Sequence, residues 1–201
     1  MKYYVLFALL LIFPELSYAH GQLSADGFVS GLLHPVLGID HLLAMLAVGV
    51  ASTLMHRYAV ITAPATFVLV MALSAYLAMQ GWYLSYIELG ISVSVLILGA
   101  LIHLLVKFKS SWLSLLMYLA IALFAVFHGY AHGSEIPQAA NPIHFLAGFV
   151  LATAAIHCAG VLFAYNKGHG VSSHYRVSHF ATAITAVGAM MSYLYVESWW
   201  G

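Results

Sequence analysis

The sequence predicts an all-α membrane protein, a bundle of six transmembrane helices that follows a cleaved N-terminal signal peptide. The 201 residues are 64% hydrophobic and only 6% charged, whereas a water-soluble domain carries about 25% charged residues. Six stretches are long and apolar enough to cross a bilayer, which takes roughly 20 residues. This composition excludes a soluble globular protein.

Charge and cysteine content narrow the range of partners. Six Lys and Arg balance six Asp and Glu, so the chain has no basic surface for nucleic acid. The phosphate-binding pattern G-x-x-x-x-G-K-[ST] does not occur in the sequence, so we expect no nucleotide partner. The single cysteine, Cys158, can form neither a disulfide framework nor a cysteine-based metal cluster. Histidine is unusually frequent, with twelve residues. Because imidazole binds metal ions, we expect a divalent metal ion as a partner, in addition to the lipid bilayer.

The first element, residues 1–19, is predicted to be a signal peptide. Lys2 precedes an apolar stretch, and the small residues Ser17 and Ala19 follow it. A charged start, an apolar core of about 7–15 residues and small residues before the cut are typical of a secretory signal peptide. Cleavage after Ala19 would leave residues 20–201 as one transmembrane domain whose N-terminus starts outside the cytoplasmic membrane.

Six apolar segments follow, separated by short breaks that contain polar residues, glycine or proline. Such short connections favour an up-and-down bundle. The expected spans are residues 36–55, 59–80, 86–106, 112–131, 143–165 and 178–196.

The positions of Lys and Arg predict the orientation, because cytoplasmic loops are enriched in these residues. With the mature N-terminus outside, all basic residues after the signal peptide fall on the cytoplasmic side. They are Arg57, Lys107, Lys109, Lys167 and Arg176. We therefore expect a multi-pass protein of the cytoplasmic membrane with its mature N-terminus outside.

The first span carries ionisable side chains into the membrane. Pro35 suits the first turn of a helix, with His34 just before it. On a continuous helix, His34, His41 and Met45 share one face. Asp40 lies inside the apolar region, where an unpaired charge costs about 2.5–3.5 kcal/mol. We expect a cation or a histidinium to compensate it; the alternative is a hydrogen bond that only fixes the geometry of the bundle.

A second motif lies at the outer end of the fourth span. His128 and His132 stand one turn apart, at the i, i+4 spacing that lets two imidazoles share a metal ion. Glu135 continues the same face if the helix extends past Gly133. This motif is expected at the same membrane depth as the first one, so the two motifs together predict a cation site.

Met45 is a possible further ligand or path residue, and four more residues are candidates with a simpler alternative each. Glu88 begins the third span and could equally be an interfacial residue that faces water. His144 begins the fifth span and could equally be a helix-start residue. His157 lies deep in the fifth span, where it would continue a path inward. His20, once at the N-terminus, offers an α-amine and an imidazole to a cation, or is simply what cleavage leaves.

The H-P-x-x-G-x-D-H pattern of residues 34–41 resembles the HupE/UreJ family of hydrogenase and urease accessory membrane proteins. The resemblance continues in the F-H-G-x-A-H-G-x-E pattern of residues 127–135, in Gly148-Phe149, and in the spacing of His157 and Gly160. It implies uptake of nickel, or in some members cobalt, for nickel enzymes made in the bacterial cytoplasm. The residues that it implies for the cation site are His34, Asp40, His41, His128, His132 and Glu135.

The leading interpretation is that the protein is a secondary transporter of Ni²⁺ in the bacterial cytoplasmic membrane. We therefore do not expect it to be an enzyme. Imidazole suits nickel, copper and zinc alike, so the ligands alone leave Co²⁺ and Zn²⁺ open as the ion. A cytoplasmic nickel chaperone is a further candidate partner. The alternatives are an intramembrane zinc-dependent hydrolase and a nickel-binding accessory protein that does not transport.

Overall fold

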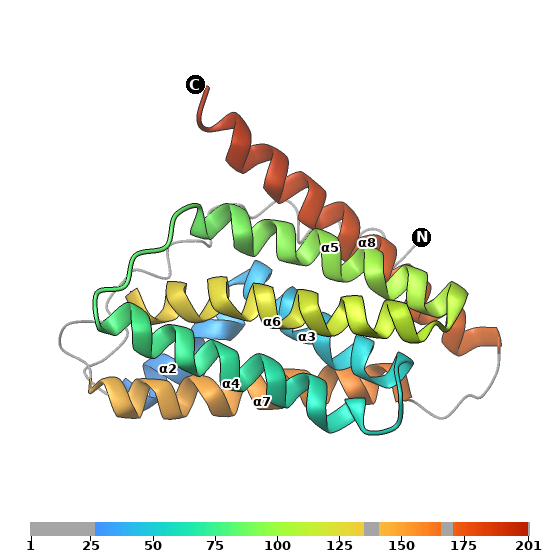
Figure 1. Ribbon diagram of the computed structural model, residues 1–201, viewed down its shortest axis with the longest axis horizontal. Helices are drawn as coiled ribbons and strands as arrows, with labels where there is room; N and C mark the ends of the chain where they lie inside the picture. Colours follow the sequence, from blue (N-terminus) through green and yellow to red (C-terminus); the bar gives the residue numbers. More distant parts are fainter. Residues whose placement is uncertain (1–26, 135–140, 166–170, 201) are drawn as a thin grey trace.

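The computed structural model describes residues 27–134, 141–165 and 171–200, and every regular element within them is an α-helix (Figure 1). The predicted signal peptide, His20 and Glu135 lie outside the described residues. The all-α prediction is confirmed. In chain order, the helices are α2 Gly27–Leu37, α3 Ile39–Leu54, α4 Ala59–Met79, α5 Ile87–Phe108, α6 Ser111–Ser134, α7 Pro142–Tyr165 and α8 Val171–Glu197.

Five of the described helices are long and apolar enough to cross a membrane, namely α4, α5, α6, α7 and, from His174, α8. The pair α2 and α3 passes the same test only together, so the structure has five candidate spans, or six if the bent pair is one of them. The last helix begins at Val171 rather than at residue 178. Its polar first turns extend the helix beyond the apolar stretch, since a helix need not end at the membrane boundary.

The continuous helix expected through His34, His41 and Met45 is wrong, because the chain breaks between α2 and α3. The chain is already helical from Gly27, Pro35 lies near the end of α2 rather than in a first turn, and α2 meets α3 at 80°. The break falls at Gly38, whose backbone is extended. Pro35 has no N–H to offer the carbonyl of Gly31, and glycine is a poor helix former. Because these two breakers lie three residues apart, the helix ends between them.

Two glycines let α2 and α7 lie in direct backbone contact. A Cβ on Gly31 would overlap the carbonyl oxygen of Phe145, and a Cβ on Gly148 would overlap the carbonyl oxygen of Phe28. Small residues facing each other are how membrane helices approach closely. This packing holds the last turn of α2, which carries His34, against the first half of α7.

The other helices run antiparallel to their sequence neighbours around α3 (Figure 1). Most residues of α3 from Ala44 to Ser52 are buried, because α4, α5 and α7 all contact it. Helix α4 lies along α6, where the hydroxyl of Ser74 donates a 2.6 Å hydrogen bond to the carbonyl of Val126. Helix α8 packs on α5 and leans away from the rest of the bundle toward its C-terminal end (Figure 1).

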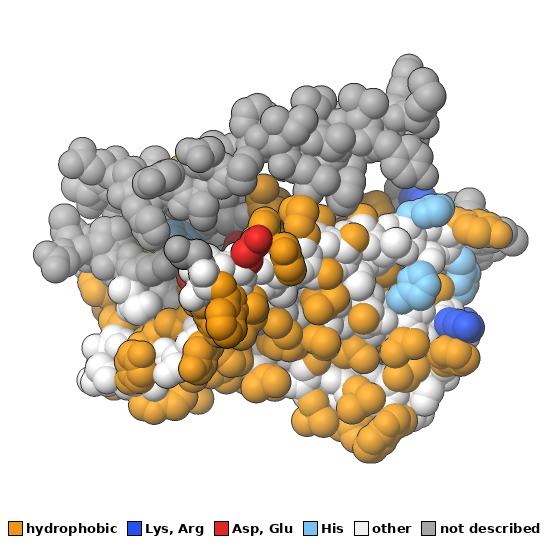
Figure 2. Space-filling model, turned by 90° about the horizontal axis from the view of Figure 1, so that it is seen from above, with side chains coloured by type: hydrophobic (Ala, Val, Ile, Leu, Met, Phe, Trp, Pro, Cys, Tyr) orange, Lys and Arg blue, Asp and Glu red, His pale blue; other side chains and the backbone are white. Residues whose placement is uncertain are grey.

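Charged residues separate between the two ends of the bundle. At the basic end, where α3, α5 and α7 end, lie all the described Lys and Arg residues: Arg57, Lys107, Lys109 and Arg176. Toward the acidic end, where α3 and α5 begin and α8 ends, lie the described acids Asp40, Glu88 and Glu197. Figure 2 shows a largely hydrophobic face with Lys or Arg side chains confined to one end.

Candidate functional site

Asp40 and His41 form a hydrogen-bonded pair in the first turn of α3. Oδ1 of Asp40 lies 2.7 Å from Nδ1 of His41 and also accepts a 2.8 Å hydrogen bond from the backbone N–H of His41. Only 19% of the Asp40 side chain and 13% of the His41 side chain are exposed. The first turn of a helix presents unpaired N–H groups and a partial positive charge, which stabilise a carboxylate there. These interactions compensate a charge that would otherwise be costly inside the membrane.

Gly38 leaves room for this pair. A Cβ on Gly38 would lie 3.0 Å from Oδ1 of Asp40 and 3.1 Å from Nδ1 of His41. The φ angle of −85° at Gly38 is open to any residue. Glycine is therefore needed at this break for space rather than for backbone freedom.

Counting His41 itself, four histidines from three helices meet at this pair. The ring centroid of His132 lies 4.5 Å from that of His41 and 4.8 Å from that of His34, and the His41 and His128 centroids are 4.9 Å apart. The bend between α2 and α3 brings the rings of His34 and His41 within 6.5 Å. Asp40 and these four histidines are called the histidine cluster below. The structure thus brings together five of the six residues predicted for the cation site.

The two α6 histidines are fully buried and retain unused nitrogens. Nδ1 of His128 lies 2.9 Å from the carbonyl oxygen of Phe124, which can only accept, so Nδ1 carries the proton and Nε2 keeps its lone pair. Among the described residues, neither Nε2 of His128 nor either ring nitrogen of His132 has a hydrogen-bond partner. A buried group left unsatisfied costs about 1–3 kcal/mol. An imidazole held at one nitrogen by a carbonyl is also the arrangement found in metal-binding histidines.

The histidine cluster is not a formed coordination shell. Within the part of the chain that the structure describes, no three His, Cys, Asp or Glu side chains are placed to hold a metal ion together. The imidazoles instead pack edge to face. Binding of a metal ion by three or more of these side chains would therefore require them to rearrange.

Two phenylalanines of α7 line the histidine cluster; the sequence marks Phe149 only through the family resemblance and does not mark Phe145. The ring of Phe149 lies 3.9 Å from that of His132, and the ring of Phe145 lies 5.7 Å from that of His34. Both side chains are buried. Their spacing of four residues on an apolar helix is shared with ordinary core positions, so periodicity alone does not mark them.

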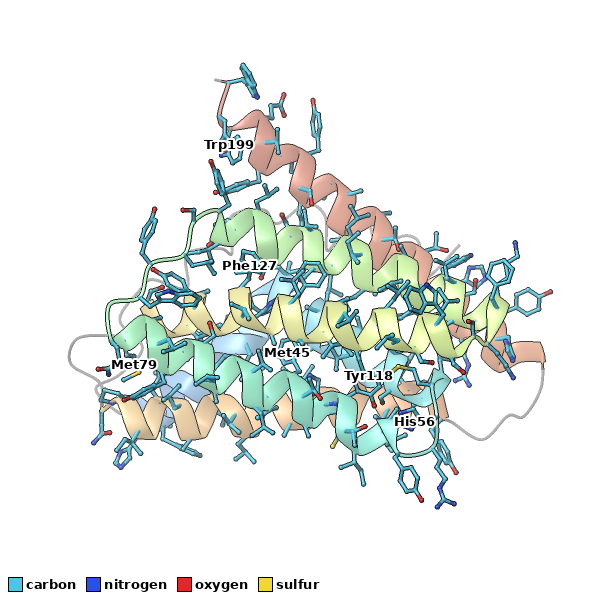
Figure 3. All side chains as sticks on the ribbon, viewed as in Figure 1. Met45, His56, Met79, Tyr118, Phe127 and Trp199 are labelled. Carbon is cyan, nitrogen blue, oxygen red and sulfur yellow. The ribbon has the colours of Figure 1, made fainter. Side chains whose placement is uncertain are left out.

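The remaining candidates differ in their surroundings. Glu88 is exposed in the first turn of α5. His144 is exposed in the first turn of α7, where its backbone N–H donates a 3.3 Å hydrogen bond to the side chain of Asn141, as expected of a helix-start residue. Met45 is fully buried one turn after His41 and lies toward the middle of the bundle (Figure 3).

His157 is not part of the histidine cluster and lies beside the aromatic ring of Phe67. It is 1% exposed, and among the described residues neither of its ring nitrogens has a hydrogen-bond partner. The ring of Phe67, on α4, lies 5.5 Å from that of His128 and 5.3 Å from that of His157. Phe67 therefore contacts both histidines. The next residue in the chain, Cys158, is exposed.

Comparisons with known proteins cover most of the chain. The family model described as HupE / UreJ protein matches residues 8–191. Protein HupE of Rhizobium leguminosarum bv. viciae is 37% identical over 151 residues, which cover 75% of this chain and 77% of that protein. No solved structure matches the chain. The matched region contains both histidine motifs and every helix from α2 to α7. The chain is therefore a multi-pass membrane protein that belongs to the HupE/UreJ family, a transporter and accessory family associated with nickel for hydrogenase and urease and not a family of enzymes.

Proposed function

We propose that this protein takes up Ni²⁺ across the bacterial cytoplasmic membrane and supplies it for the maturation of nickel enzymes. The observation that carries the proposal is the histidine cluster, in which four imidazoles and one carboxylate from three helices meet inside an apolar bundle. Ionisable residues within a membrane are costly and mark ion pathways. In this proposal the metal ion is the substrate of the protein.

The donor set supports a borderline divalent cation. Neutral imidazole and carboxylate suit Ni²⁺, Co²⁺ and Zn²⁺, and the buried nitrogens of His128 and His132 lack other partners among the described residues. We propose Glu135, which follows Ser134 in the sequence, as a further ligand, and Glu88, His144, Met45 and His20 as lesser candidates. The family association favours nickel, with cobalt as the second candidate.

The proposed orientation places the histidine cluster near the outer surface. The described Lys and Arg residues lie at the basic end, and basic residues mark the cytoplasmic side. A signal peptide over residues 1–19 would place the mature N-terminus outside, consistent with this orientation. Nickel would then enter at the acidic end and leave at the basic end, where a cytoplasmic nickel chaperone could receive it.

Transport is favoured over a store or a hydrolase. A nickel store needs only the outer cluster, whereas buried polar groups continue inward as far as His157. A zinc-dependent hydrolase is disfavoured by the family, whose members are transporters and accessory proteins. The buried histidine beyond Phe67 is thus the feature that favours passage of the ion.

The test is uptake of radioactive nickel by cells that lack their own nickel importers. We expect Asp40→Asn and His41→Ala to abolish uptake because they remove the pair at the start of α3, and excess Co²⁺ to compete. His103→Ala is the matched control, since His103 is exposed on α5. Membrane levels of each variant are matched by immunoblot.

A second assay separates transport from storage. Purified protein is reconstituted into liposomes that contain a nickel-sensitive dye, which reports ions that have crossed the bilayer. A nickel-binding protein that does not transport would leave the dye unchanged. Absence of both cellular uptake and dye response, with correct insertion verified, would contradict the proposal.

A further inference from the structure

The hydroxyl group of Thr153 on α7 differs from the other threonine hydroxyls of the helices. The hydroxyls of Thr62, Thr66, Thr182 and Thr185 each lie within hydrogen-bond distance of the carbonyl oxygen four residues earlier. Thr153 is completely buried, yet among the described residues its hydroxyl has no hydrogen-bond partner. Because buried hydroxyls are normally satisfied by their own helix or by a neighbour, Thr153 retains both a donor and an acceptor.

His157 lies one turn beyond Thr153 on the same face of α7. Residues four apart on a helix are neighbours, with a rise of about 6 Å between them. Both ring nitrogens of His157 also lack partners among the described residues. Two adjacent buried polar groups are thus left unsatisfied inside a membrane bundle, where no lipid atom can satisfy them.

Thr153 and His157 lie further along α7, toward the basic end, than the point where α7 contacts the histidine cluster. Phe149, which packs on His132, lies one turn before Thr153 and two turns before His157, a rise of about 12 Å. The ring of Phe67 contacts both His128 and His157. The ring of Phe67 therefore lies beside both ends of a path from the cluster to His157.

A different set of helices, which shares only α3 with the histidine cluster, surrounds His157. A Cβ on Gly49 of α3 would overlap the carbonyl oxygen of His157, so α3 lies against the backbone of α7 at this point. Helix α4 supplies Phe67 from another side. The surroundings of His157 thus come from α3, α4 and α7, whereas the histidine cluster is built from α2, α3 and α6.

We propose that Thr153 and His157 form a second, inner binding step for the transported divalent cation, separated from the histidine cluster by Phe67; this proposal rests on the transport function proposed above. The imidazole supplies one nitrogen ligand and the hydroxyl supplies one oxygen, with water completing the shell. Two protein ligands bind more weakly than the four imidazoles and carboxylate of the cluster. A weaker second site lets the ion leave the cluster without being trapped, as conduction through successive sites requires.

The test compares Thr153→Val with Thr153→Ser, and His157→Leu with Cys158→Ala. Valine keeps nearly the shape of threonine without its hydroxyl, whereas serine keeps the hydroxyl. Cys158 is adjacent to His157 but exposed. Each variant is measured for nickel transport into dye-loaded proteoliposomes, for equilibrium binding of nickel in detergent, and for melting temperature.

We expect Thr153→Val and His157→Leu to lower the transport rate by about tenfold or more, as loss of a ligand or its support does. Nickel binding by the cluster should persist, and the melting temperature should hold or rise, because an unsatisfied buried group is replaced by an apolar one. Thr153→Ser and Cys158→Ala should transport like the wild type. A merely structural role predicts the stability change without the loss of transport.

Other outcomes overturn the proposal in distinguishable ways. Wild-type rates for both Thr153→Val and His157→Leu would eliminate the inner step and leave the proposed transport function intact. Loss of nickel binding in these variants as complete as in Asp40→Asn would show that there is no separate inner site. Failure of the wild-type protein to transport would remove the proposed function, and the inner step with it.

Discussion

Two hydrogen bonds to one carboxylate oxygen hold Asp40 and His41 together at the start of α3. The carboxylate therefore orients the imidazole as well as carrying charge, in the way that outer-shell carboxylates orient metal-binding histidines. The structure contains the hydrogen bond that the purely geometric alternative for Asp40 requires, and it also places three more imidazoles beside the pair. A substitution that displaces the pair but keeps both side chains can separate the orienting role of the Asp40 carboxylate from its role as a charge.

Gly38→Ala is such a substitution. The added Cβ would lie 3.0 Å from Oδ1 of Asp40 and 3.1 Å from Nδ1 of His41, so the pair must shift by a few tenths of an ångström. We expect nickel uptake to fall by about tenfold, as loss of support for a ligand does, while the protein still inserts and folds. Uptake is compared with Val36→Ala, a change at an exposed position two residues earlier. Wild-type uptake by Gly38→Ala would show that the precise placement of the pair does not matter.

The sequence predicted which residues come together at the site, but it did not predict the backbone path that brings His34 close to His41. His128 and His132 lie at the i, i+4 spacing of a continuous helix, α6, so the expectation that they share one face holds. His34 and His41 were expected on one face of a straight helix, but they approach each other across the 80° bend. Phe145 and Thr153 carry no local signal that separates them from core residues, because their surroundings come from other helices, and Phe149 is marked only by the family resemblance.

At the scale of helices, the contact between α2 and α7 positions His34. Gly148→Leu would force a side chain into the carbonyl oxygen of Phe28 and push α2 from its place. Overpacking of this kind costs about 1–3 kcal/mol. We expect a lower melting temperature in detergent together with reduced nickel uptake, because His34 moves with α2.

The matched control for this change is Ala147→Leu, which adds a similar side chain at the exposed neighbouring position. It should leave both measurements near the wild-type values. Equal losses in the two variants would indicate a general intolerance of α7 to large residues rather than a specific contact with α2.

For the whole molecule, the bent pair decides the topology. With six spans the N-terminal side of α2 and the C-terminal end of α8 lie on the same side of the membrane, and with five they lie on opposite sides. The structure supports either number by length and composition. The connection between α5 and α6 gives a fixed reference for the two topologies. It carries Lys109 and is therefore expected in the cytoplasm.

Cysteine accessibility tests the proposed six spans. In a Cys158→Ala background, Ser24→Cys should react with a membrane-impermeant maleimide in intact spheroplasts, because the proposed orientation places the mature N-terminus outside. Ser110→Cys, between α5 and α6, should react only after lysis. Labelling of Ser24→Cys only after lysis would mean that α2 and α3 enter the membrane without crossing it.

The exposed thiol of Cys158, next to the buried imidazole of His157, also offers an attachment point for a spectroscopic probe. Because this is the one cysteine in the sequence, a nitroxide can be attached there with no engineered residue. Paramagnetic Ni²⁺ bound at His157 would speed the electron spin relaxation of that nitroxide more strongly than Ni²⁺ held only at the histidine cluster, which lies further from Cys158. The labelled chain, with no residue substituted, can therefore report whether the ion reaches His157.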